Sequence, residues 1–318
     1  MPPLIEVKNL SKYFEVPAGM LHAVENVSFT IEKGQTLGVV GESGCGKSTL
    51  GRTMIRLQEA TAGHILLDGE DITHVSGKKL KEVRKKVQIV FQDPYSSLNP
   101  RLRIDDTIQE PLRNSGDYSR SQLKEKASSL MDLVGIDTRL RQSYPHELDG
   151  GRRQRVGIAR ALAVNPEFIV CDEPVSSLDV SIQAQVLNLL MDLQDQMGVT
   201  YMFVTHDLSV VRHISNNICV MYLGEVVEMS PSKELFANSL HPYTKALLSA
   251  IPSIDIDQPM RPVQLKGELT SPINPKPGCR FFPRCPYARG GCSEQPQQLE
   301  EVSPQHYVAC CRVHDING

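Results

Sequence analysis

The stretch that decides the fold is Gly41-Glu42-Ser43-Gly44-Cys45-Gly46-Lys47-Ser48-Thr49, which fits the pattern G-x-x-x-x-G-K-S from its first to its eighth residue. It follows an apolar run, residues 37–40, that predicts a strand, and it opens a run, 49–57, that is compatible with a helix. A glycine-rich loop in this setting turns backbone N–H groups and the positive end of a helix toward phosphate. The sequence therefore predicts a phosphate-binding loop, and residues 41–49 are candidate nucleotide ligands.

Side chains at two places in the sequence suit the chemistry of such a site. The Lys47 ammonium is expected to reach the β- and γ-phosphates, and the Ser48 hydroxyl is expected to ligate Mg²⁺. A later apolar run, residues 168–171, ends in Asp172 and Glu173. We expect Asp172 to orient Mg²⁺, directly or through water, and Glu173 to act as the general base toward the attacking water.

The bulk composition limits the class of protein. The chain has 318 residues, with 34 basic and 37 acidic side chains and a net charge of −3, which argues against a strongly cationic nucleic-acid binder. No run approaches the roughly 18 apolar residues that a membrane span requires. Residues 1–7 lack the basic and apolar blocks of a signal peptide. These features predict a cytoplasmic protein that docks on a membrane partner.

Most of the chain follows an α/β pattern. Residues 1 to about 240 alternate helical patterns with short apolar runs, and the strand candidates are 36–40, 87–91, 168–172 and 201–205. Helical spacing from Val180 to Met197 predicts a helix that ends at Gly198. Residues from about 100 to 165 contain two helical patterns, 121–133 and 152–163, and no clear strand. We therefore expect a helical subdomain inserted into the α/β core.

Further short motifs occur in a defined order along the chain: Gln92, Leu148–Arg152, Ser177-Leu178-Asp179 and Thr205-His206-Asp207. Combined with the glycine-rich loop and the paired acids, this order resembles the nucleotide-binding domain of ABC transporters over about residues 4–240. The resemblance implies a P-loop NTPase fold of the ABC type that binds ATP and Mg²⁺ and works as a dimer of two such domains.

The family implies roles for several side chains. Phe14 is implied to stack on adenine, with Tyr13 as the rival aromatic residue. Gln92 is implied to contact Mg²⁺ and water and to relay the nucleotide state to membrane subunits. His206 is expected to sense or stabilise the γ-phosphate, and Asp179 is implied to lie at the dimer interface.

The segment Leu148-Asp149-Gly150-Gly151-Arg152 resembles the family's signature, usually Leu-Ser-Gly-Gly-Gln, which faces the γ-phosphate held by the other subunit. Asp149 replaces the serine, and an ionised carboxylate cannot donate a hydrogen bond to phosphate. Two like charges at ~4 Å in a partly screened site repel by about 4 kcal/mol. That would weaken the facing subunit's site and imply pairing with a different ATPase chain. Alternatively, Asp149 caps the following helix while the amides of Gly150 and Gly151 bind phosphate.

Five of the eight cysteines crowd the end of the chain: Cys279, Cys285, Cys292, Cys310 and Cys311. In a reducing compartment such a group binds metal more often than it forms disulfides. Four thiolates suit either a [4Fe–4S] cluster or a structural Zn²⁺, and the spacings match no standard zinc-finger template. A metal would also explain how so short a tail becomes ordered.

Together with His241-Pro242-Tyr243-Thr244, this tail resembles the C-terminal extension of ATP-binding subunits of oligopeptide and dipeptide permeases, over about residues 241–312. The resemblance implies a [4Fe–4S] cluster, with Zn²⁺ as the alternative. The implied ligands are Cys279, Cys285, Cys292 and Cys310, with Cys311 as the alternative to Cys310. We therefore expect two domains, 1–240 and a metal-stapled extension 241–318, with a proline-rich, extended segment at 252–277.

The resemblance implies an ATPase that energises the import of dipeptides or oligopeptides as a peripheral subunit on the cytoplasmic face of the cell membrane. The implied partners are a second ABC ATPase subunit of different sequence, two transmembrane permease subunits and, indirectly, a solute-binding protein. One alternative is an importer of nickel or another small solute. Another is a soluble ABC ATPase acting on nucleic acid or ribosomes, which is disfavoured because the chain has no coiled-coil run, second ATPase domain or basic tail; no nucleic-acid partner is expected.

Overall fold

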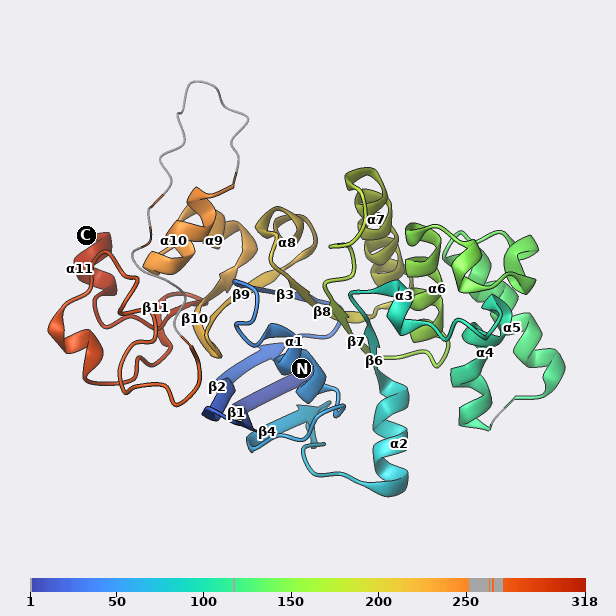
Figure 1. Cartoon of the computed structure of the whole chain (residues 1–318), viewed down its shortest axis with the longest axis horizontal. Coiled ribbons are helices and arrows are strands. Elements are labelled where there is room, and N and C mark those ends of the chain that lie inside the picture. The colour runs from blue at the N-terminus through green and yellow to red at the C-terminus, as the bar shows by residue number, and fades with distance from the viewer. Residues whose placement is uncertain (1, 117, 252–262, 264, 266–270) are drawn as a thin grey trace. The chain divides into compact units, whose positions relative to one another are not determined.

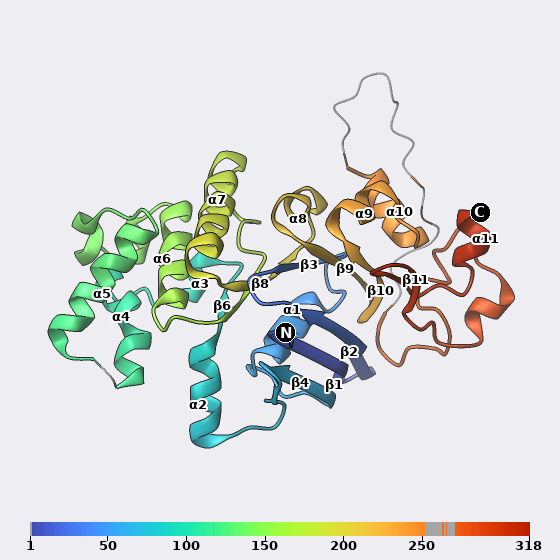
Figure 2. The same ribbon diagram turned by 180° about the vertical axis from the view of Figure 1, so that it is seen from behind.

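A computed structural model describes residues 2–116, 118–251, 263, 265 and 271–318. The chain forms two compact units. The first contains Met1–Ile31, Gln35–His74 and Phe203–Gly318, and the second contains Glu32–Gly34 and Val75–Met202. Figures 1 and 2 show the elements of both units from opposite sides.

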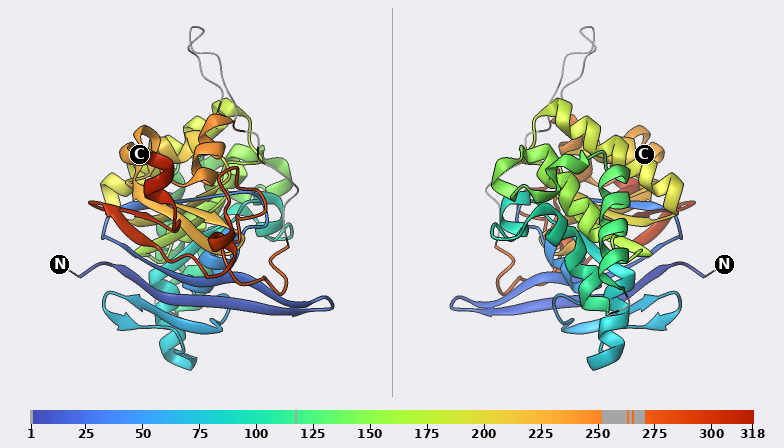
Figure 3. Two further views of the ribbon diagram at one scale, coloured as in Figure 1. Left: turned by 90° about the vertical axis from the view of Figure 1, so that its left-hand side faces the viewer. Right: turned by 90° about the vertical axis from the view of Figure 1, so that its right-hand side faces the viewer.

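The first unit contains an antiparallel sheet built on a long hairpin. Strands β1 (Ile5–Val16) and β2 (Gly19–Ile31) form the hairpin, and β4 (Ala62–Leu67) and β5 (Glu70–Asp71) complete the order β2-β1-β4-β5. Figure 3 shows the hairpin extending beyond the other strands of this sheet. Asp68 and Gly69, both at positive φ, form the turn between β4 and β5 that an Asp-Gly pair favours.

A second sheet of this unit carries the glycine-rich loop. Strand β3 (Thr36–Val40) pairs in parallel with β9 (Asn217–Tyr222), which pairs antiparallel with β10 (Glu225–Pro231). Two strands of the C-terminal extension, β12 (His306–Val308) and β11 (Glu300–Ser303), continue the sheet beyond β10. The tail is therefore part of the same sheet as the strand that precedes the loop.

The helices of this unit are α1 (Lys47–Met54), α8 (Leu208–Ile214), α9 (Ser232–Ala237), α10 (Pro242–Ser249) and α11 (Val313–Asn317), with a 3-10 turn, η3, at Gly290–Ser293. Helix α1 begins where the glycine-rich loop ends, as the sequence predicts. Residues 252–262, 264 and 266–270 of the proline-rich segment lie outside the described residues, so its predicted extended conformation stays a prediction there. Beyond them, Ile273 forms an isolated antiparallel bridge with Leu21 of the hairpin.

Buried polar and aromatic groups hold the extension to the unit. His306 and Glu228 are fully buried and lie 2.7 Å apart, and the Glu228 carboxylate also accepts hydrogen bonds from the amides of Leu240 and His241. Buried polar groups that are hydrogen-bonded avoid the cost of unsatisfied burial. Tyr222, Tyr243 and Phe281 pack against one another beside this network, with ring centroids 4.8–5.5 Å apart.

The second unit is largely helical. Its parallel strands β6 (Val87–Val90) and β7 (Phe168–Asp172) are accompanied by α2 (Gly77–Lys86), α3 (Pro94–Ser97), α4 (Ile104–Ser115), α5 (Arg120–Leu133), η1 (Thr138–Gln142), η2 (Pro145–Glu147), α6 (Gly150–Leu162) and α7 (Val180–Met197). The described residues between 100 and 165 contain helices and no strand. Leu112, Leu123 and Ala163 form a buried cluster where α4 and α5 pack near the end of α6.

The predicted helix at 180–197 coincides with α7, which ends at Gly198 in a left-handed conformation. Strand β8 (Thr200–Thr205) begins in the second unit and ends in the first. In the described part of the chain, none of the helices has both the length and the hydropathy that crossing a membrane requires.

Candidate functional site

Glycines shape the phosphate-binding loop because its backbone passes close to other backbone. A Cβ on Gly46, which has a φ of 104°, would lie 2.0 Å from the carbonyl oxygen of Ala23. A Cβ on Gly41 would lie 2.2 Å from the carbonyl oxygen of Met221. Any other residue would clash at either position. Gly46 is also the N-cap of α1. Because glycine has no side chain that could accept hydrogen bonds from the first N–H groups of the helix, these groups can donate to a ligand.

Lys47 is held over this loop. Its side chain is buried, and its ammonium donates hydrogen bonds to the carbonyl oxygens of Gly41, at 2.8 Å, and Glu42, at 2.9 Å. Phosphate oxygens are stronger acceptors for an ammonium than neutral carbonyls are. The Lys47 ammonium thus lies at the loop, where phosphate oxygens of a bound nucleotide would replace the two carbonyl oxygens as its acceptors.

Sequence reasoning missed how residue 42 is anchored. The Glu42 amide donates to the Tyr243 hydroxyl oxygen at 2.9 Å, and its carboxylate accepts two hydrogen bonds from Arg284, at 2.7 and 3.0 Å. Both partners belong to the C-terminal extension. No local pattern in the sequence signals these contacts, because the partners are separated by 201 and 242 positions in the chain.

The two candidate adenine-stacking residues differ in their surroundings. The Tyr13 hydroxyl donates to Glu25 at 2.6 Å, and its ring stacks on His22 with centroids 4.2 Å apart. The Lys12 ammonium lies 4.7 Å from the centre of the Phe14 ring. Both rings thus have partners of their own, and the choice of Phe14 over Tyr13 for adenine stays a prediction.

In the second unit the structure brings two predicted residues together at the end of β7. Asp172 is buried, and the Gln92 side-chain amide donates to the Glu173 carboxylate at 3.0 Å. Glu173 has a φ of 47°, a left-handed conformation that costs a non-glycine residue roughly 1–3 kcal/mol. Such strain is typical of functional sites. The pair Gln92–Glu173 has the groups needed to hold and deprotonate a water molecule.

Asp149 adopts the capping arrangement. It is the N-cap of α6, and its carboxylate accepts a hydrogen bond from the Arg152 amide at 2.7 Å. A Cβ on Gly151 would lie 2.6 Å from the Ile182 side chain, so close packing of α6 on α7 requires glycine there. The structure thus shows the carboxylate turned toward its own helix, and its effect on a facing subunit stays a prediction.

Asp179 and His206 also lie at element ends. Asp179 caps α7, where hydrogen bonds from the Ile182 amide and then the Ser181 hydroxyl lower the pKa of its carboxyl. His206 follows β8 and precedes Asp207, the N-cap of α8. Residues 14, 41–49 and 206 belong to the first unit, whereas residues 92, 149–151, 172, 173 and 179 belong to the second.

The tail cysteines lie around one small cavity. All five line a space of about 20 Å³, together with the apolar faces of Phe281 and Phe282. The Cys279 amide donates to the Cys292 carbonyl at 2.8 Å, and the Cys292 and Cys311 sulfurs lie 3.9 Å apart. Burial raises the pKa of the Cys279 thiol to about 12 and that of Cys310 to about 11. Within the described residues, no three cysteine, histidine, aspartate or glutamate side chains are arranged to hold a single metal ion.

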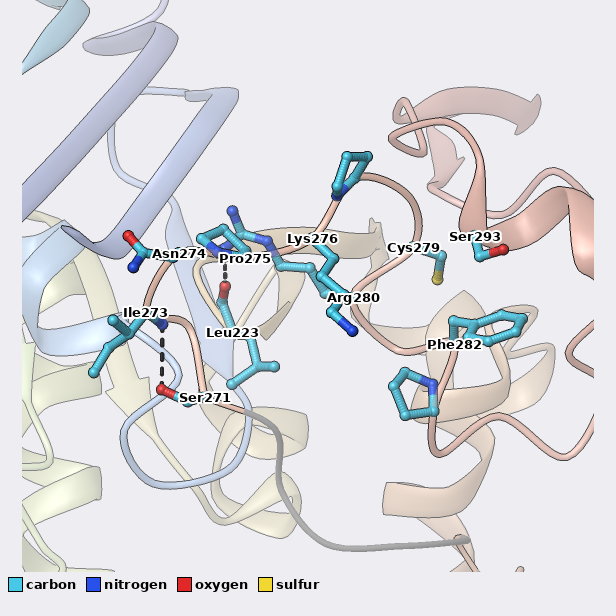
Figure 4. A pocket seen from close by; sticks show the side chains of 12 residues that line it. Leu223, Ser271, Ile273, Asn274, Pro275, Lys276, Cys279, Arg280, Phe282 and Ser293 are labelled. Carbon is cyan, nitrogen blue, oxygen red and sulfur yellow. Dashed lines mark hydrogen bonds between the residues drawn. The ribbon is translucent and has the colours of Figure 1, made fainter. Parts of the chain in front are cut away.

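A larger pocket, of about 670 Å³, lies beside this segment. Figure 4 shows Cys279 and Arg280 on its wall, together with Lys276 and Leu223. The Arg280 guanidinium donates to the Leu223 carbonyl at the β9–β10 turn. The cysteine segment thus contacts the sheet that carries the phosphate-binding loop.

Comparison with known proteins agrees with this geometry. The family described as ABC transporter matches residues 24–176, and the family described as oligopeptide/dipeptide transporter, C-terminal region, matches residues 227–292. The chain is 50% identical to the oligopeptide transport ATP-binding protein AppF of Bacillus subtilis (strain 168), covering 96% of each. It is 48% identical to the putative oligopeptide transport ATP-binding protein YkfD of the same organism, covering 97% of this chain and 95% of YkfD.

Solved structures show the same fold. The structure of cbiO1 from Clostridium perfringens, part of the ABC transporter complex cbiONQ, is 27% identical, with a TM-score of 0.67 over 75% of this chain and 92% of cbiO1. The dimeric structure of MJ0796, a bacterial ABC transporter cassette, is 30% identical, with a TM-score of 0.65 over 72% of this chain and 98% of MJ0796. The chain therefore belongs to the ABC transporter family, among the ATP-binding proteins of its oligopeptide and dipeptide transporters.

Proposed function

We propose that the chain is the ATP-hydrolysing subunit of an importer of dipeptides or oligopeptides. The observation that carries this proposal is the union, in one chain, of an ATP-binding loop with the C-terminal region of oligopeptide and dipeptide transporters. Relatives that align over nearly the whole chain are named for oligopeptide transport.

In the proposed mechanism, ATP enters the glycine-rich loop and Lys47 exchanges the carbonyls of Gly41 and Glu42 for phosphate oxygens. Ser48 and Asp172 would hold Mg²⁺, with Gln92 contacting the ion and water. Glu173 accepts the proton of the attacking water. Preorganised charge and a positioned base account for most of the rate enhancement in phosphoryl transfer.

Phe14 is proposed to stack on adenine, and His206 is proposed to contact the γ-phosphate. A second ATPase chain of different sequence would place its signature segment against the nucleotide bound by this chain. In return, Gly150 and Gly151 of this chain would face the nucleotide bound by that subunit. Asp179 would lie at the interface between the two. Because Asp149 caps α6, the glycine amides remain directed outward from the helix start. Closure of this dimer on ATP would move two transmembrane permease subunits, to which this chain binds at the cytoplasmic face, and a solute-binding protein would deliver the peptide.

We propose that the tail cysteines hold a [4Fe–4S] cluster, with Zn²⁺ as the alternative. What supports a metal group is that all five tail cysteines line one small cavity, since thiolates are the ligands that both a cluster and Zn²⁺ take. Cys279, Cys285, Cys292 and either Cys310 or Cys311 would hold the cluster. The cluster would cross-link separate segments of the extension.

The decisive experiment is transport by the assembled complex. The chain is purified with the membrane subunits that accompany it, the complex is placed in vesicles, and uptake of labelled dipeptides and oligopeptides is measured with and without ATP. ATP-dependent peptide uptake that is lost in Glu173→Gln supports the proposal. Uptake of Ni²⁺ but not peptide would assign the nickel-importer alternative, and co-purification with ribosomes in place of membrane subunits would contradict transport altogether.

A further inference from the structure

The residues from Cys279 to Cys285, here called the cysteine loop, carry two arginines that lie next to cysteines. Arg280 follows Cys279 and Arg284 precedes Cys285. Both arginine side chains are buried, with 7% and 10% of their surface exposed. Both guanidinium groups form ion pairs with carboxylates of the ATP-binding part of the chain.

Arg284 pairs with the phosphate-binding loop itself. Its guanidinium donates to both carboxylate oxygens of Glu42, at 2.7 and 3.0 Å. Paired hydrogen bonds of this kind fix orientation as well as charge. An arginine guanidinium is charged at any physiological pH, so this contact is an ion pair.

Glu42 is an unusual neighbour for phosphate because it brings a negative charge into a loop that must bind a polyanion. Like charges in a partly buried site repel strongly, and a buried carboxylate without a partner is costly. Arg284 cancels this charge. The Tyr243 hydroxyl fixes the Glu42 amide at the same time, and the Glu42 carbonyl receives Lys47. Each polar group of residue 42 is therefore engaged, two of them by the C-terminal extension.

Arg280 makes the corresponding contact with the hairpin. Its guanidinium lies 3.0 Å from Glu25 of β2 and 3.0 Å from Glu225 of β10. Glu25 also accepts the Tyr13 hydroxyl proton at 2.6 Å, and Tyr13 precedes Phe14, the proposed adenine-stacking residue. The cysteine loop is thus tied to both the phosphate-binding segment and the adenine-stacking segment.

We propose that Arg284 is a positioning residue for ATP: it neutralises and orients Glu42, so that the cysteine loop sets the ATP affinity of this chain's own phosphate-binding loop. Arg280 supports the same coupling through Glu25. The inference rests on the proposed nucleotide site at residues 41–49. It assigns to the extension a direct part in ATP binding, in addition to any structural role of a metal.

The test is a double-mutant cycle in the full-length chain. Arg284→Gln, Glu42→Gln and the double variant are titrated at equilibrium with a fluorescent ATP analogue, and thermal unfolding is recorded for each. We expect Arg284→Gln to weaken binding by about tenfold, because Glu42 is left unpaired beside the phosphates. The double variant should recover to within about threefold of the wild type, since both charges are gone. Arg289→Gln, which removes an exposed arginine of the same extension, is the matched control and should bind as the wild type does.

A purely structural role for the pair would give the opposite pattern, in which the double variant binds no better than Arg284→Gln. That result, or wild-type affinity in Arg284→Gln, would overturn the proposal. Arg284→Lys keeps the charge without the paired hydrogen bonds and should bind more tightly than Arg284→Gln. Failure of the wild-type chain to bind the analogue, or equal binding by Lys47→Ala, would instead contradict the nucleotide site and so the proposed function.

Discussion

The side-chain amide of Gln92 donates a hydrogen bond to the carboxylate of Glu173 at 3.0 Å, and Glu173 is held there in a left-handed backbone conformation. The hydrogen bond constrains the carboxylate of the proposed general base, which directly follows the last residue of β7. A base must lie within hydrogen-bonding reach of the proton that it removes. The relationship between these residues therefore leads to the first prediction.

Glu173→Gln should bind ATP but lose turnover by at least about 10²-fold, because an amide cannot accept the proton of the attacking water. The variant should accumulate as a closed, ATP-bound dimer with its partner subunit. Steady-state phosphate release and size-exclusion chromatography with ATP measure the two effects. Normal steady-state hydrolysis by this variant would rule out the catalytic role of Glu173.

Gly46→Ala should abolish ATP binding or fold poorly, because its Cβ would lie 2.0 Å from the Ala23 carbonyl oxygen. Gly44→Ala is the matched control, since it is also at positive φ but a Cβ there meets no atom within 4 Å. The control should lose only about 1 kcal/mol of stability from backbone strain. ATP titration and thermal unfolding of both variants compare these costs, and equal behaviour would contradict the proposed close approach.

Asp149→Ala should lower the free energy of unfolding by about 1 kcal/mol, because the cap of α6 is lost. Asp149→Ser keeps a capping oxygen and should unfold like the wild type. In the assembled complex, Asp149→Ser also tests the charge. Faster turnover or tighter ATP binding in the partner's site would show that the carboxylate weakens that site, whereas unchanged values would leave capping as its whole role.

The buried side chain of His241 should make the free energy of unfolding depend on pH. Burial lowers the pKa of this histidine to about 4, and its Nδ1 accepts the Tyr243 amide hydrogen as the N-cap of α10. The unfolded chain therefore binds more protons between about pH 6.5 and 4, and the free energy of unfolding falls as the pH falls through that range, by up to about 3 kcal/mol. His241→Asn keeps a capping oxygen and should show a smaller fall. Thermal unfolding of both proteins across this range measures the difference, and parallel curves would contradict it.

The metal prediction is tested by anaerobic purification. A [4Fe–4S] cluster should give a brown protein with visible thiolate–iron absorbance, and iron and sulfide in equal amounts. Cys292→Ser should lose the colour, and separate serine substitutions of Cys310 and Cys311 should show which of them is the fourth ligand. A colourless protein that contains zinc would contradict the cluster.

Local features of the sequence predict local parts of the site well. The strand and helix around the phosphate-binding loop, the acids at the end of β7, and helix α7 with its terminal Gly198 all depend on neighbouring residues, so patterns of a few residues indicate them. The choice between the two interpretations of Asp149 depended on a side-chain direction that the sequence does not specify. The structure shows the capping direction.

Long-range contacts could not be predicted in this way. Glu42 and Arg284 are separated by 242 positions, and only the path of the chain brings them together. The conformation of Glu173 likewise has no local signal, since positive φ is normally indicated by glycine. The sequence therefore predicts which chemistry is present, whereas the three-dimensional structure is needed to show that the extension contacts the loop that performs it.

The pairing of β12 with β10 also has a consequence for the solubility of the chain. Without the extension, β10 would be an edge strand with unpaired backbone groups and mostly buried side chains, which invites pairing with another molecule. With the extension in place, the edge is β11, which begins with the exposed carboxylates of Glu300 and Glu301. Charged residues on an edge strand discourage such pairing. The tail thus replaces an aggregation-prone edge with one that repels other sheets.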